Sequence, residues 1–131
     1  METTTKIYTP AQANRALPLV RRIVDDILEQ AREVRALAEL SGEENAEHDP
    51  DVRAGQKEVD RLLDELAGLG LEFKDPEFET GLVDFPAEID GRPVLLCWNG
   101  TEDSVTHFHG VTEGYASRQP IPAELLDGEG A

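Results

Sequence analysis

The residues best suited to chemistry lie within one stretch of about forty residues, 80–120. It contains the only cysteine, Cys97, and two of the three histidines, His107 and His109. Because side chains alternate along a strand, His107 and His109 would lie on the same face. With Cys97 or Asp84 nearby, they could provide three ligands for a divalent transition metal. The spacing is not that of a four-ligand zinc motif, so ordinary hydrogen-bonded or exposed histidines are the other interpretation.

A second hypothesis concerns recognition of a negatively charged group. Arg118 is one of only two basic residues in 80–131. A guanidinium can clamp a carboxylate or a phosphate. The alternative is a structural ion pair, for example with Asp84, that attaches the last segment to the sheet. We expect a polar binding site made of Asp84, His109 and Arg118, with Trp98 providing a flat apolar contact.

Catalysis has less support in the sequence. Cys97 could act as a nucleophile with a histidine as its base, but no oxyanion-hole loop accompanies it. No carboxylates are spaced as a general acid and base. We therefore expect a non-catalytic binding or assembly module, with a metal-binding protein as the alternative and an enzyme of unrecognised class as the second. A binding module of this kind needs no cofactor, and the metal-binding alternative implies a divalent transition metal.

The first half of the chain predicts a helical hairpin over residues 7–70. Thr9 and Gln12 form a capping box around Pro10, and apolar residues then recur at alternating spacings of three and four. Pro18 predicts a kink or break between a short helix at 10–17 and a long one at 18–40. An acidic mobile loop is expected at 43–51, followed by a second helix that ends near Gly68. Because these apolar stripes along the two helices leave apolar surface exposed, we expect a homodimer through the hairpin.

The second half predicts a β-meander and C-terminal segment over 71–121. Strands are expected at 82–89, 92–98 and 104–111, with a further short one at 71–74. Asp90-Gly91 predicts a two-residue hairpin turn that pairs Val83 with Trp98 and Asp84 with Cys97. The fold class is thus α+β: one domain, 1–131, with a long antiparallel helical hairpin on a three- to four-stranded antiparallel sheet and a flexible tail at 122–131.

The composition limits the partners and the compartment. The formal net charge is −16, from 12 basic and 28 acidic residues. Nucleic-acid binding needs clustered basic residues, so we do not expect it. The acidity favours solubility, with a basic protein partner as the alternative. No signal peptide and no membrane-spanning apolar run is visible, and the single cysteine fits a reducing compartment, so a cytoplasmic protein is expected.

Several motifs in combination also resemble a known family. They cover residues 7–121 and include Tyr8-Thr9-Pro10, Gly81-Leu82-Val83-Asp84-Phe85-Pro86, Leu96-Cys97-Trp98 and Gly114-Tyr115-Ala116-Ser117-Arg118-Gln119-Pro120. The chain is similar to a bacterial family known as domain of unknown function 2203. The resemblance implies a small cytosolic domain without an established activity. It also implies that the shared residues are Asp84, Trp98, His109, Gly114 and Arg118. His107 lies outside the shared pattern, and Ser117 replaces a small glycine.

Overall fold

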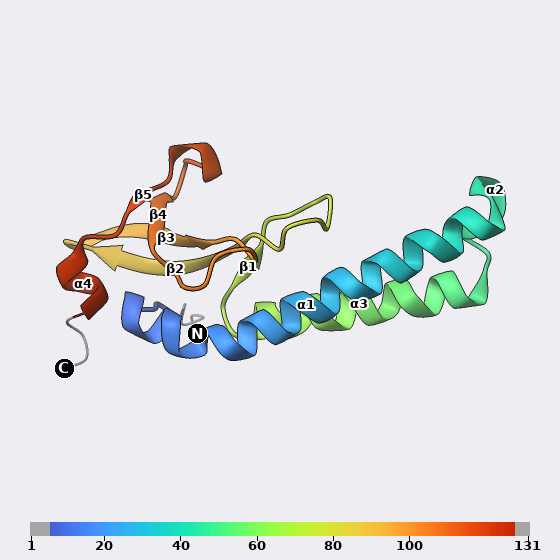
Figure 1. Cartoon of the computed structure of the whole chain (residues 1–131), viewed down its shortest axis with the longest axis horizontal. Coiled ribbons are helices and arrows are strands. Elements are labelled where there is room, and N and C mark those ends of the chain that lie inside the picture. The colour runs from blue at the N-terminus through green and yellow to red at the C-terminus, as the bar shows by residue number, and fades with distance from the viewer. Residues whose placement is uncertain (1–5, 128–131) are drawn as a thin grey trace, which may run out of the picture.

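A helical hairpin packs on one face of an antiparallel sheet, which confirms the α+β prediction (Figure 1). The structure is a computed structural model that describes residues 6–127. The sheet covers only one end of the hairpin, and the other end extends beyond it (Figure 1). Within residues 6–127, no helix is both long and apolar enough to cross a bilayer.

Helix α1 (Pro10–Ser41) begins at the predicted capping box. The Thr9 hydroxyl accepts the Gln12 N–H at 3.0 Å, and the Gln12 side chain accepts the Thr9 N–H at 3.0 Å. The predicted division at Pro18 is wrong, since one continuous helix passes through this residue. Residues on both sides of the proline are buried against the core, Leu17 at 4% exposure and Val20 at 0%. Tertiary packing therefore keeps the helix whole despite the lost hydrogen bond.

Helix α3 (Pro50–Gly68) returns along α1 and ends where the sequence predicts. Asp49 caps it by accepting the N–H groups of Asp51 and Val52. The two helices approach closely at Gly55, where a Cβ atom would lie 2.5 Å from the Val34 side chain. Between the helices, the segment expected to be a mobile acidic loop contains a short helix, α2 (Glu43–Ala46).

The sheet has five strands rather than the three or four predicted. They follow chain order as a meander: β1 (Glu72–Phe73), β2 (Val83–Ile89), β3 (Arg92–Trp98), β4 (His107–Gly110) and β5 (Gln119–Pro120). The strand that the sequence does not reveal is β5, because two residues are too few to show an alternating pattern.

The β2–β3 hairpin has the register predicted from its turn. Asp90 and Gly91 have φ values of 54° and 79°, as a type I′ turn requires. Val83 then pairs with Trp98, and Asp84 pairs with Cys97. The hairpin consequently has an apolar face toward the helices and a second face that carries the polar candidates.

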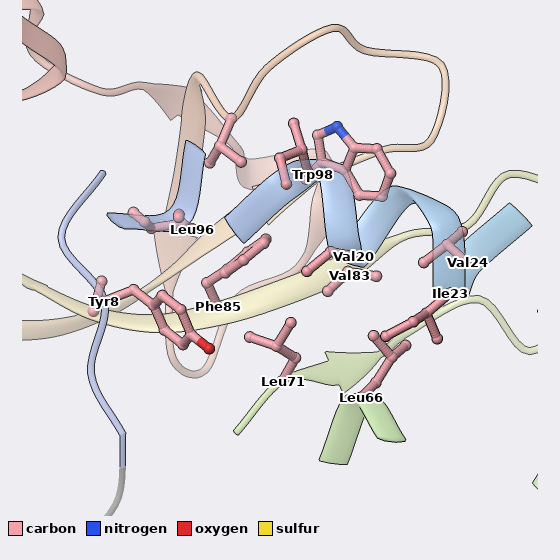
Figure 2. Close-up of a cluster of buried hydrophobic side chains, with 14 of the residues drawn as sticks. Tyr8, Val20, Ile23, Val24, Leu66, Leu71, Val83, Phe85, Leu96 and Trp98 are labelled. Atoms are coloured by element: carbon pink, nitrogen blue, oxygen red, sulfur yellow. The ribbon is translucent and has the colours of Figure 1, made fainter. Parts of the chain in front are cut away.

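The core lies between the apolar face of the sheet and the near ends of α1 and α3 (Figure 2). Trp98 and Phe85 are fully buried in it. Tyr8 packs edge-on against Phe85, with ring centroids 5.3 Å apart, and its hydroxyl donates to the Leu69 carbonyl at 2.6 Å. The segment before α1 is therefore fixed to both layers.

The C-terminal segment differs from the flexible tail predicted for 122–131. Residues Ala123–Asp127 form helix α4, which contacts α1. Leu125 and Leu126 are partly buried against the core. These two leucines pack the helix against the core. The rest of the predicted tail, 128–131, lies outside the described residues.

Candidate functional site

Three polar side chains from adjacent strands meet on the face of the sheet opposite the helices. Asp84 belongs to β2, Cys97 to β3 and His109 to β4. One ligand atom from each lies within 4.8 Å of the other two. All three residues are buried, Asp84 at 1% exposure, Cys97 at 0% and His109 at 2%. The sequence predicts these residues as candidates, and the fold brings them together.

The hydrogen bonds of His109 fix which ring nitrogen faces the cluster. Its Nδ1 lies 2.8 Å from the Gly110 carbonyl oxygen, which can only accept, so Nδ1 carries the proton. In the neutral ring, Nε2 then has a lone pair, and it lies 3.3 Å from a carboxylate oxygen of Asp84. Two acceptors face each other at this distance only if a proton or a cation lies between them. The contact is therefore either an ion pair between protonated His109 and Asp84 or a place for a bound cation.

Lys74 provides a positive charge at the edge of the cluster. Its Nζ lies 3.6 Å from Oδ2 of Asp84 and 3.6 Å from Oε1 of Glu72. The Lys74 side chain is 40% exposed, whereas that of Asp84 is 2% exposed. Lys74 is thus placed between the buried carboxylate and solvent, and it faces the oxygen of Asp84 that His109 does not contact.

A pocket of about 280 Å³ leads from solvent to Asp84 and His109. Its remaining walls are made by Lys74 and by residues of the β1–β2 and β4–β5 connections: Leu82, Glu113, Gly114 and Tyr115. The pocket thus lies against the buried pair, whose exposure is only 1% for Asp84 and 2% for His109.

Cys97 is not an activated nucleophile in this environment. Burial, supported by the nearby negative charge of Asp84, raises the pKa of the Cys97 thiol to about 11. The Arg118 guanidinium acts in the opposite direction but does not compensate. The thiol is therefore protonated at neutral pH, unless a metal ion displaces the proton.

His107 does not join the cluster, although it lies opposite Cys97 in the β3–β4 register. Its Nδ1 lies 2.9 Å from the Thr106 hydroxyl, and its side chain is only half-buried. The predicted ligand set of four is therefore reduced to three. His109, two pairs further along the ladder, is the histidine that turns toward Asp84.

Arg118 forms a structural ion pair, but its partner is Glu102 rather than Asp84. The two guanidinium contacts to the Glu102 carboxylate measure 3.1 and 2.7 Å. The guanidinium carbon lies 4.4 Å from the Tyr115 ring centroid, and Nη1 is 3.4 Å from the Cys97 carbonyl oxygen. Arg118 thus borders the cluster while its charge is already paired.

Trp98 lies on the other face of the sheet from the cluster, within the core. Its indole N–H donates to the Glu102 carbonyl at 3.0 Å, and the Arg21 guanidinium carbon lies 5.1 Å from its ring centroid. The flat apolar contact predicted for a ligand is therefore made with the protein itself.

Two contributors to the site were not singled out from the sequence. In the sequence, Lys74 stands out only as one of few basic residues in its region. No motif or spacing around Glu113 indicates a role in a site. The Glu113 carboxylate accepts the Gly110 N–H at 2.9 Å, and the Glu113 N–H donates to the Gly110 carbonyl at 3.0 Å. That carbonyl is the one that binds Nδ1 of His109. Lys74 and Glu113 thus contribute through contacts with distant or irregular segments, which a sequence pattern does not reveal.

Comparison with known proteins assigns a family to the chain. The family model described as uncharacterized conserved protein (DUF2203) matches residues 6–121. The chain belongs to this family, which confirms the resemblance seen in its motifs. No curated protein and no solved structure matches it.

Proposed function

We propose that this DUF2203 member is a non-catalytic binding protein that holds one divalent transition metal ion through Asp84, Cys97 and His109. The observation that carries the proposal is the convergence of one ligand atom each from the buried residues Asp84, Cys97 and His109, with His109 Nε2 3.3 Å from the Asp84 carboxylate. A metal ion between them would take the place of the proton and make two coordination bonds. Both side chains are almost fully buried, so solvent offers little compensation.

The donor set and spacing favour zinc. Imidazole, thiolate and carboxylate are the ligands that Zn²⁺ uses in proteins. Ligand atoms at about 2.1 Å from a tetrahedral ion lie roughly 3.4 Å from each other. The separation of 3.3 Å between His109 and Asp84 is close to this value. The hydrogen bond from Nδ1 to a backbone carbonyl is also the usual support for a metal-binding histidine.

The state of Cys97 supports binding rather than nucleophilic catalysis. A thiol whose pKa is raised to about 11 is a poor nucleophile, but a metal ion can displace its proton. Metal binding by the cluster should therefore release a proton and weaken as the pH falls. The same dependence would not be expected of a site made of carboxylates alone above their pKa values.

Elemental analysis of protein purified without a histidine tag tests the proposal. We expect one equivalent of metal in the wild type after zinc loading and dialysis, and its loss in His109→Ala. His107→Ala is the matched control, because it removes an imidazole two residues away that lies outside the cluster. Circular dichroism establishes that each variant is folded. Wild-type protein without bound metal, or equal losses in both variants, would refute the proposal.

A further inference from the structure

We infer that the metal ion binds a small carboxylate as its fourth ligand, with Lys74 recognising the negative charge. The inference rests on the proposed function, and it concerns the side of the cluster that faces the pocket.

The cluster provides three donors and leaves one position free. Within residues 6–127, only Asp84, Cys97 and His109 form a group of possible ligand atoms this close together. Structural zinc sites take all four ligands from the protein, whereas sites with three protein ligands leave the fourth position to water or another molecule. A fourth ligand from solution is therefore required for tetrahedral coordination.

The pocket provides access to this position. It is lined by Asp84 and His109, and its volume is about 280 Å³. Since a water molecule takes about 30 Å³ of liquid, the space suits a molecule of a few heavy atoms. Lys74 and Tyr115 line the same pocket, so a molecule that reaches the metal passes beside both side chains.

Lys74 allows the site to receive an anion. A dication with one thiolate, one carboxylate and a neutral imidazole has no net charge. Lys74 adds a partly exposed ammonium group 3.6 Å from both Asp84 and Glu72, and its three N–H donors leave one for a further acceptor. The negative wall residue Glu113 is already engaged with the Gly110 N–H. A carboxylate can coordinate the metal with one oxygen and accept a hydrogen bond from Lys74 with the other, which is a charge-assisted interaction.

Cobalt-substituted protein offers a direct test with acetate as the probe. Co²⁺ reports its ligands in the visible spectrum, including a thiolate-to-metal band from Cys97. We expect acetate to change this spectrum in a saturable way. Lys74→Met should raise the apparent Kd for acetate roughly tenfold, as expected for loss of one charge-assisted hydrogen bond, without abolishing Co²⁺ binding. Lys74→Arg should retain much of the affinity, and Lys57→Met on α3 is the matched control.

The outcomes separate this inference from the proposed function. Absence of a cobalt spectrum overturns the metal site and the carboxylate ligand together. A cobalt spectrum that does not respond to acetate leaves the metal site standing and overturns the inference. A response that is unchanged in Lys74→Met overturns the role of Lys74. The backbone N–H of Lys74 donates to the Leu82 carbonyl at 2.8 Å whatever side chain it carries, so the variant should keep its strand.

Discussion

Asp75 provides a strong test of how the loop before β2 is stabilised. One oxygen of its buried carboxylate accepts three backbone N–H groups, those of Glu79 at 2.7 Å, Thr80 at 2.7 Å and Gly81 at 2.8 Å. These bonds close the connection between β1 and β2, with Lys74 directly after β1 and Asp84 within β2. Loss of the carboxylate should therefore destabilise the protein more than an ordinary surface substitution.

The magnitude follows from the number of groups left without a partner. Each buried N–H that loses its acceptor costs about 1–3 kcal/mol. With water reaching part of the loop, Asp75→Ala should lower the free energy of unfolding by about 3–5 kcal/mol. Asp75→Asn keeps a carbonyl oxygen but loses the charge, so we expect a smaller loss of about 1–2 kcal/mol.

The effect should also depend on pH. Burial raises the pKa of Asp75, but the backbone hydrogen bonds from Gly81, Thr80 and Glu79 outweigh this and hold it below its usual value. Because the folded pKa is the lower one, the stabilisation is complete above the unfolded pKa of about 4 and is lost as the pH falls through the folded pKa.

Urea unfolding followed by circular dichroism measures both effects. We expect the stability difference between wild type and Asp75→Asn to be largest at neutral pH and to shrink below about pH 4. Asp90→Asn provides a matched control, because this exposed carboxyl lies in the hairpin turn. A difference that grows on acidification, or an Asp75→Ala variant as stable as the wild type, would refute the reasoning.

Three further predictions concern positions around the site. Glu113→Ala should weaken metal affinity by roughly 10–100-fold in chelator competition, because Glu113 fixes the peptide that orients His109. Glu113→Gln should largely preserve the affinity, and a Glu113→Ala affinity equal to that of the wild type would contradict this role. Arg118→Ala should lower the free energy of unfolding by about 1–3 kcal/mol through loss of the Glu102 pair, and an unchanged melting temperature would contradict the structural role. Gly81→Ala should cost more than about 2 kcal/mol in thermal unfolding, because its φ is +78° and a Cβ would lie 2.4 Å from the nearest core methyl; wild-type stability would exclude this packing.

Elements specified by local chemistry were predictable from the sequence. The Thr9 cap and the Asp90-Gly91 turn depend on residues within a few positions of each other, and both formed as expected. Pro18 was misleading because packing against distant residues outweighs its local preference. Strand β5 and helix α4 depend on contacts that adjacent residues do not reveal.

The candidate site was only partly predictable for the same reason. The residue types identified Asp84, Cys97 and His109, and the hairpin register placed the first two together. Register alone would have favoured His107 opposite Cys97, so the selection of His109 depends on ring orientation set by Gly110. The pairing of Arg118 with Glu102 likewise joins two irregular segments that no spacing connects.

The part of the helical hairpin that extends beyond the sheet has a consequence for hydrogen exchange. The buried residues of this part, Ala31, Val52 and Val59, lie outside the core cluster shared with the sheet. Opening this end need not disturb the β-meander, so its amides should exchange by sub-global opening. Amides near Val20 and Leu66, which are packed in the shared core, should exchange only with global unfolding. The hairpin thus combines two levels of protection within continuous helices, and its outer end can rearrange while the cluster of Asp84, Cys97 and His109 stays intact.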